Sequence, residues 1–171
     1  MQFSFILYLL MESSISLDAI DLRLLDLLQQ DAALSNQALA ARAHVSPATG
    51  LRRVRRLVEA GLIERQVALL SPDRLGAGIS AIVEITLDRQ GSEELDAFEA
   101  HVLPEAAVQQ CWRVSPGPDF VLVLHAADMP AFQQLSQRLF TSHANVRNVK
   151  SFFALKRSKF EPRLTLPKLP T

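Results

Sequence analysis

Four arginines within five positions carry the clearest chemical signal in this sequence. Arg52, Arg53, Arg55 and Arg56 lie between Ser46 and Gly61. Guanidinium groups neutralise phosphates, and a single one can read the edge of a guanine through two hydrogen bonds. A helix that exposes these arginines would therefore bind a nucleic acid, whereas a solvated cationic surface is the plainer interpretation of such a charge run.

The residues around the arginines predict one short helix that positions them. Ser46 supplies a capping oxygen, Pro47 suits the first helical position, and Gly61 suits the left-handed residue that ends a helix. The apolar positions recur at three- and four-residue spacing, which predicts a single buried stripe with the arginines mostly off it. They are Leu51, Val54, Leu57 and Val58.

Two further helices are predicted upstream. Asp18 caps an amphipathic helix over 18–29, a turn follows over 31–34, and Ser35 caps a second helix over 36–43. With the arginine helix they predict a helix-turn-helix, in which the second helix of the pair enters the major groove of DNA. Residues 62–70 are apolar enough to predict a small two-stranded wing, which completes a winged helix-turn-helix.

We expect particular polar residues to contact DNA. Short polar groups near helix starts would contact phosphates; they are Ser35, Asn36, Gln37 and Ser46. Thr49, Arg52 and Arg53 are predicted near base edges, and Arg42, Arg55 and Arg56 near phosphates. Some arginines are expected to pair with Glu59 or Asp31 instead, and Arg53 is the strongest candidate for a structural role. Glycine inside a helix is unfavourable, so Gly50 predicts a close approach of two helices.

The second half of the chain has the pattern of an α+β domain. Its strands and helices alternate as β-α-β-β-α-β, which is the ferredoxin-like order. The predicted strands cover 79–87, 108–114, 120–125 and 146–155, and the helices cover 92–101, capped by Ser92, and 129–140. Helices would cover one sheet face only, so the other apolar face is expected to pair with a second copy of the chain.

The domains predicted in this way are an N-terminal extension (1–16), a winged helix-turn-helix (17–70), a linker (71–77), a ferredoxin-like domain (78–156) and a C-terminal tail (157–171). The apolar run over residues 1–10 is too short to span a membrane and lacks the features of a signal peptide. We interpret Met11 as the native start, with an N-terminal element that packs on a partner subunit as the alternative.

Composition excludes several classes of function. The formal net charge is zero, but residues 42–65 hold six arginines against two glutamates, and local charge is what a phosphate backbone senses. The tail is also basic, which supports either DNA contact or simple solvation. One cysteine excludes an internal disulfide and fits the cytoplasm, and the scattered histidines predict no metal site. We expect no cofactor.

An ordered set of short motifs resembles the Lrp/AsnC (feast/famine) family of transcriptional regulators. The resemblance is ungapped from about residue 17 to 76 and continues more weakly to about 156. The matching residues are Leu17–Asp21, Leu28–Asp31, Leu39-Ala40, Val45-Ser46, Arg53–Leu57, Gly61–Ile63 and Leu75-Gly76. The resemblance implies a DNA-binding regulator that forms homodimers or larger homo-oligomers such as tetramers or octamers, and that responds to an amino acid.

The resemblance also implies an effector site in the loop before the third strand of the second domain. Ser115, Gly117 and Asp119 match its frame, with Ser151 on the last strand as a weaker candidate. Pro116 stands where the family usually has glycine, and proline has no N–H to offer a carboxylate. Asp119 would suit the ammonium group of an amino acid. Alternatively, the loop is a rigid hairpin in which Asp119 caps a neighbouring amide.

Two other functions stay open at this point. The chain also resembles siroheme decarboxylases, which have the same two-domain layout and a histidine in the segment at the wing. The matching residues here, 67–72, contain no histidine to transfer a proton. We therefore expect no enzyme. The proline in the loop makes an effector-independent DNA-organising protein the second alternative.

Overall fold

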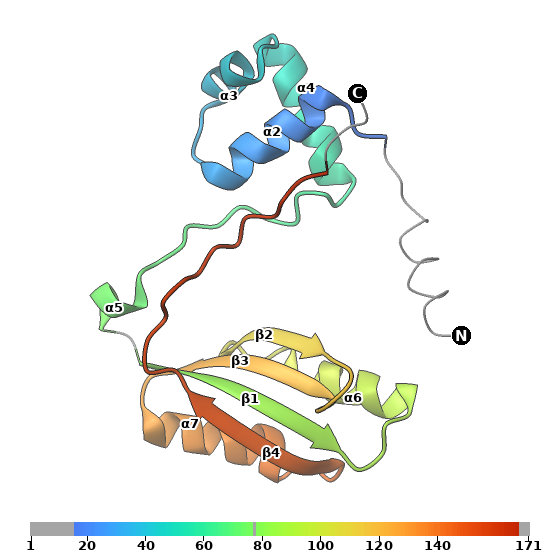
Figure 1. Ribbon diagram of the computed structural model, residues 1–171, viewed down its shortest axis with the longest axis vertical. Helices are drawn as coiled ribbons and strands as arrows, with labels where there is room; N and C mark the ends of the chain where they lie inside the picture. The colour runs from blue at the N-terminus through green and yellow to red at the C-terminus, as the bar shows by residue number, and fades with distance from the viewer. Residues whose placement is uncertain (1–15, 77, 168–171) are drawn as a thin grey trace. The chain divides into compact units, whose positions relative to one another are not determined.

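The computed structural model describes residues 16–76 and 78–167 (Figure 1). The chain forms two compact units. One holds the described residues up to Leu69 and those from Glu161 onward, and the other spans Leu70–Phe160. The chain therefore returns to the first unit at its C-terminal end. The expected start at Met11 and the apolar run before it lie outside the described residues.

Three helices build the first unit, as the sequence predicts. They are α2 (Ala19–Gln30), α3 (Asn36–Ala43) and α4 (Pro47–Glu59). Each begins after an extended residue whose side chain accepts backbone N–H groups: Asp18, Ser35 and Ser46. Gly61 adopts φ +71°, the left-handed conformation expected after the last turn of α4.

The buried face of α4 differs from the predicted apolar stripe. Leu57 is fully buried, but Leu51 and Val58 are 42% and 50% exposed. Arg53 lies on the inner side instead, because its partners are carboxylates of α2. The core of this unit is small and consists of Leu24, Leu39, Ala43 and Leu57, with partly buried leucines, valines and isoleucines around it.

Residues 62–70 contain no strand, so the predicted two-stranded wing is not seen. The backbone N–H groups of Leu62 and Ile63 bond back to the carbonyl of Leu57, which ends α4 tightly. Val67, Leu69 and Leu70 beyond this turn are exposed. A one-turn helix, α5 (Pro72–Leu75), lies in the region predicted as a linker.

The second unit is a four-stranded antiparallel sheet in the order β2-β3-β1-β4 (Figure 1). The β-α-β-β-α-β order is confirmed. The elements are β1 (Ile79–Leu87), α6 (Ser92–Val102), β2 (Val108–Arg113), β3 (Phe120–Ala126), α7 (Met129–Ser136), the π-helical turn η1 (Gln137–Thr141) and β4 (Val146–Phe153). Gly91, and not Ser92, holds the N-cap position of α6, and it offers no side-chain cap.

Both long helices cover the same face of this sheet. Alternate residues of the central strands pack against Phe98 and Val102 of α6 and Phe132 and Leu135 of α7. The opposite, open face carries exposed apolar side chains: Ile82, Trp112 and Phe152. Ile82 pairs with Phe152 and with Val123 in register, so the apolar residues run across neighbouring strands. Of the helices in the described ranges, none is long and apolar enough to cross a membrane.

Candidate nucleic-acid interface and small-molecule loop

The turn between α3 and α4 brings the two helices into close contact. His44 caps α3 in a left-handed conformation, φ 57°, and donates its N–H to carbonyls in the last turn. A Cβ placed on Gly50 would lie 3.2 Å from Cβ of Ala40. The close approach expected from a glycine inside a helix is confirmed, and it fixes how α4 sits against α3.

Short polar side chains connect the starts of both helices. The hydroxyl of Ser35 accepts the N–H of Ala38, and the hydroxyl of Ser46 accepts the N–H of Thr49. The donor–acceptor distance is 3.2 Å in both hydrogen bonds. Nδ2 of Asn36 donates to the carbonyl of Pro47 at 3.0 Å, which ties α3 to the first turn of α4. The polar residues Ser35, Asn36, Gln37 and Ser46 are exposed, and Thr49 is half-buried. Their oxygens thus organise the helix starts at the protein surface.

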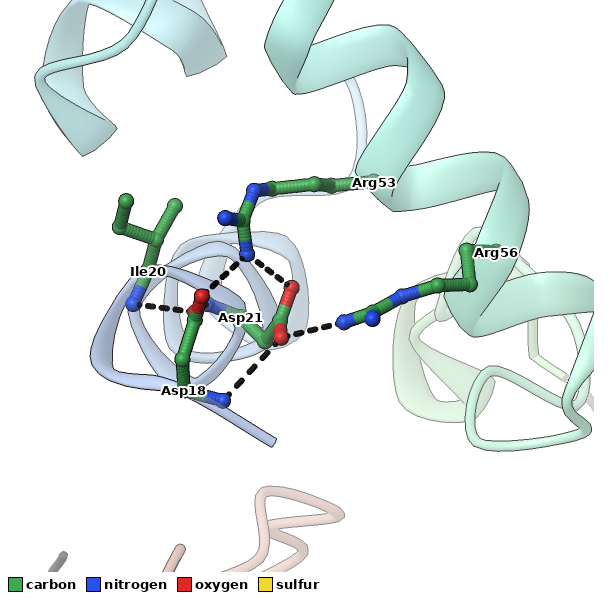
Figure 2. A network of polar contacts seen from close by, with 5 residues as sticks. All are labelled: Asp18, Ile20, Asp21, Arg53 and Arg56. Carbon is green, nitrogen blue, oxygen red and sulfur yellow. Dashed lines mark hydrogen bonds and ion pairs between the residues drawn. The ribbon is translucent and has the colours of Figure 1, made fainter. Parts of the chain in front are cut away.

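A buried carboxylate on α2 holds two of the four arginines (Figure 2). Asp21 is 1% exposed; its Oδ1 lies 2.9 Å from Nη1 of Arg53, and its Oδ2 accepts from Nη2 of Arg56. Nη1 of Arg53 also lies 2.7 Å from Oδ2 of Asp18. Arg53 therefore has the structural role expected of it, and its partners are Asp18 and Asp21 instead of Glu59 or Asp31.

The capping box at the start of α2 strengthens this network. Asp18 accepts the backbone N–H groups of Ile20 and Asp21, and its own N–H donates to Asp21. The N–H of Asp21, with the guanidinium of Arg53, lowers the pKa of the Asp18 carboxyl, and the carboxylates raise the pKa of Arg53. Asp18 and Arg53 therefore both stay charged at neutral pH, and their pairing helps to orient α4.

The remaining arginines of α4 lie at the protein surface. Arg52 and Arg55 are exposed, and neither has an ion-pair partner among the residues that the structure describes. Arg42 at the end of α3 is exposed as well. The side chain of Arg56 is 43% exposed despite its bond to Asp21. One helix thus carries an inner arginine, Arg53, and an outer cationic surface.

The loop between β2 and β3 contains three of the residues predicted to bind an effector. Ser115 and Gly117 are exposed, and Gly117 adopts φ +123°. Oδ2 of Asp119 accepts the backbone N–H of Leu87 at 2.7 Å and Nε2 of Gln90 at 3.1 Å. This geometry matches the alternative in which Asp119 caps a neighbouring amide.

Ser151 lies apart from that loop within one copy of the chain. It sits on β4, opposite Val83 of β1, whereas the loop joins β2 to β3. Its register places it with the residues of the helix-covered face. A joint site that includes Ser151 would therefore need residues from more than one copy.

Sequence reasoning missed Asp21 and Gln90 as residues that shape these sites. The spacing of Asp18 and Asp21 is a capping-box pattern, which could have shown that the first turn of α2 holds two carboxylates. No comparable signal exists for Gln90. No group of three or more His, Cys, Asp or Glu placed to hold a metal occurs within 16–76 and 78–167.

Comparison with known proteins matches both units. Residues 17–64 match the winged helix-turn-helix DNA-binding family, and residues 80–164 match the Lrp/AsnC ligand binding domain family. An uncharacterized HTH-type transcriptional regulator from Haemophilus influenzae is 35% identical, over 88% of this chain and 90% of the relative. The DNA-binding transcriptional activator DecR from Escherichia coli is 34% identical, over 88% of this chain and 99% of its own.

Solved structures agree in fold. A transcriptional regulator from Neisseria meningitidis in complex with L-methionine has a TM-score of 0.79 and 31% identity, covering 88% of this chain and 97% of its own. A feast or famine regulatory protein from Mycobacterium tuberculosis, complexed with L-methionine, has a TM-score of 0.77 and 30% identity, covering 87% and 99%.

Proposed function

Because this chain belongs to the Lrp/AsnC family of DNA-binding transcriptional regulators, we propose that α4 binds duplex DNA through its outer surface and that an amino acid acts on the second unit. The observation that carries the proposal is the division of the arginines on α4. Arg53 is held by carboxylates inside the unit, while Arg52 and Arg55 project from a helix whose orientation is thereby fixed. Preorganised cations bind phosphates and bases without further ordering.

Each exposed residue has its own role in this proposal. Arg52 and Thr49, near the start of α4, contact base edges, and Arg42, Arg55 and the outer part of Arg56 contact phosphates. Ser35, Asn36, Gln37 and Ser46 support phosphate contact near the helix starts, where N–H groups and the helix dipole favour anions. Arg53 acts as a positioning residue, because its Nη1 already serves two carboxylates.

We propose an amino-acid effector because two neighbours of the same fold were solved with L-methionine. In this chain, the exposed Ser115 and the N–H of Gly117 are polar groups of the β2–β3 loop that suit a carboxylate. Asp119 would face an ammonium group with the oxygen that does not accept from Leu87. Ser151 would join the site from another copy.

A homodimer or larger homo-oligomer is part of the proposal. The open sheet face carries Ile82, Trp112 and Phe152, and apolar surface of this kind favours burial against a second copy. Two copies would also present two reading helices, which increases the number of base pairs read. We place the regulator in the cytoplasm, where bacterial DNA lies, and assign it no catalytic role.

Electrophoretic shifts test the proposal directly. The probe is a duplex selected from a random pool by the full-length protein, measured at two salt concentrations with each of the twenty amino acids. Tight binding that weakens with salt and changes with one amino acid would support both parts. Binding that ignores all twenty would leave an effector-independent DNA-organising protein, which the missing N–H of Pro116 favours. Absence of binding at low salt would contradict the proposal.

A further inference from the structure

The C-terminal residues 161–167, here called the C-terminal strap, pack against α2 in the first unit. Nη2 of Arg163 lies 2.7 Å from Oδ1 of Asp26. The side-chain amide of Gln29 pairs with both backbone groups of Leu164: Oε1 accepts its N–H at 2.9 Å, and Nε2 donates to its carbonyl at 3.0 Å. The sequence predicts a solvated or DNA-contacting tail here, but the structure places specific contacts between this segment and α2.

These contacts resemble the pairing of one β-strand with the next. Gln29 acts as a substitute for a backbone amide, so it recognises the extended backbone of Leu164 and leaves the Leu164 side chain 74% exposed. Pro162 and Pro167 disfavour helix in the residues before them, which keeps the strap extended. Arg163 then sets the register, because Asp26 is its one ion-pair partner within the described residues.

A cluster on the last turns of α2 prepares this docking surface. Nε2 of Gln29 lies 3.3 Å from Oδ1 of Asp26, and Nε2 of Gln30 lies 2.9 Å from its Oδ2. The Asp26 carboxylate therefore has hydrogen-bond donors on its own helix and a cation from the strap. Arg163, ahead of the two amides, lowers the pKa of Asp26, so the carboxylate is charged at neutral pH.

The same helix holds the reading helix at its other end. Asp18 and Asp21, at the start of α2, bind Arg53 and Arg56 of α4. Asp26 and Gln29, toward its end, bind the strap. α2 therefore contacts both the reading helix and the strap, and a change in one set of contacts acts on the same helix as the other.

We propose that the C-terminal strap is a reversible second connection between the two units, and that its docking on α2 favours DNA binding. The first connection is the chain from α4 to β1. The second runs from the end of β4 to the strap, and it exists only while the strap is docked. The effect on DNA binding rests on the function proposed above, whereas the docking does not.

Reversibility follows from the exposure of the contacts. Arg163 and Asp26 are 43% and 42% exposed in their side chains, and exposed ion pairs are weak. The strap stays near α2 because it is tethered, which gives it a high effective concentration. A docked strap restricts the orientations available to α4 before it meets DNA, so less freedom is lost on binding. A change at β4 that pulls on residues 154–160 would release it.

The test combines hydrogen exchange with DNA binding on the full-length protein. Arg163→Glu breaks the pair with Asp26, and Asp26→Arg combined with Arg163→Asp restores it in reverse. Lys159→Glu is the matched control, because it makes the same change of charge just before the strap. We expect the amide of Leu164, whose N–H Gln29 accepts, to exchange faster in Arg163→Glu than in Lys159→Glu, and the swapped pair to regain protection.

The DNA measurement uses the duplex selected by the wild-type protein. We expect the Kd of Arg163→Glu to rise about three- to tenfold above that of Lys159→Glu, in line with the loss of one charge pair and its neighbouring hydrogen bonds. Wild-type strap amides that exchange like an unfolded chain would overturn the docking. Faster exchange with a Kd equal to that of Lys159→Glu would overturn the coupling. A wild-type protein that binds no DNA would contradict the proposed function, and the exchange data would still decide the docking.

Discussion

Oδ1 of Asp21 on α2 lies 2.9 Å from Nη1 of Arg53 on α4, and the carboxylate is almost completely buried. The other oxygen of Asp21 binds Arg56. One acidic residue on the first helix thus fixes the rotation of the reading helix about its own axis. The direction in which Arg52 and Arg55 project is set by this pair, and not by the apolar stripe alone.

Replacing Asp21 should unfold the first unit more readily. Asp21→Ala leaves Arg53 and Arg56 without their buried counter-charge, and we expect the free energy of unfolding to fall by about 3 kcal/mol, the lower end for a broken buried pair because the arginines are partly exposed. Helical circular dichroism in urea measures this loss. Glu64→Gln, an exposed change in the same unit, is the control; an equal effect in both variants would contradict the assignment.

Gly50 should accept alanine but no larger side chain. Alanine gains up to about 1 kcal/mol of helix propensity, offset by its contact with Ala40, so stability should change little. Gly50→Leu forces α3 and α4 apart, and we expect it to prevent DNA binding. Electrophoretic shifts compare the two variants. Wild-type affinity in Gly50→Leu would show that the close approach is not required.

Removing Arg52 and removing Arg55 should impair DNA binding in different ways. Arg55→Ala should weaken binding to every sequence and reduce the slope of log K against log salt by about 0.9, the value for one phosphate contact. Arg52→Ala should lose about 1–3 kcal/mol of discrimination at one base position. Binding titrations at several salt concentrations, on the selected duplex and on variants with single base changes, separate the two. Arg23→Ala on α2 is the control, and we expect neither effect from it.

Asp119 should stabilise the second unit whatever the effector is. Asp119→Ala removes the acceptor for the N–H of Leu87 and for Gln90, and we expect a loss of about 1–3 kcal/mol in the free energy of unfolding. Trp112, the single tryptophan, lies on β2 and reports this unit by fluorescence. Asp119→Asn keeps an acceptor and should recover part of the loss, while Asp88→Ala should have little effect. Unchanged stability in Asp119→Ala would show that the hydrogen bonds of Asp119 to Leu87 and Gln90 do not stabilise this unit.

The second unit should lose stability in mild acid because of His143. Burial, and next the neighbouring His101, lower the pKa of His143 from its ordinary 6.5. The unfolded chain then binds a proton at a higher pH than the folded chain does, so the free energy of unfolding falls as pH drops below 6.5, until the folded pKa is passed. Urea titrations followed by Trp112 between pH 7.5 and 5 measure this slope. His143→Gln should flatten it; His44→Asn, at an exposed left-handed position, should not.

Local signals made most of the helices and strands predictable. Ser35 and Ser46 mark helix starts through their own hydroxyls, and the alternation in β1 reflects a sheet with one covered face. The site was harder to predict because its contacts are distant in sequence. Asp119 and Leu87 are 32 positions apart, and the residues around each of them do not indicate the hydrogen bond between the two. The same is true of Asp21 and Arg53: the sequence predicts a structural role for Arg53 as an alternative to contact with base edges, but it does not indicate Asp21 as the partner or the exposure of Leu51.

For both the predicted wing and the C-terminal strap, the structure depends on pairing with another segment, which local sequence does not reveal. Residues 62–70 are apolar enough for strands, but a strand needs a neighbour to pair with, and the described part of this copy offers none. The strap looks like a solvated basic tail, yet Gln29 lies 135 positions away and pairs with its backbone. Composition alone cannot indicate a pairing that depends on the backbone of another segment.

The position of β1 in the centre of the sheet has a consequence for how the protein is made. Its partners are β3 and β4, and Ala81 pairs with Phe153, so the sheet cannot close until nearly all of the second unit has left the ribosome. The helices of the first unit make mainly local contacts and can fold while synthesis continues. The arginine-bearing helix can therefore form in the cell before the sheet of the second unit exists, so a nascent chain carries its reading helix before it carries the second unit.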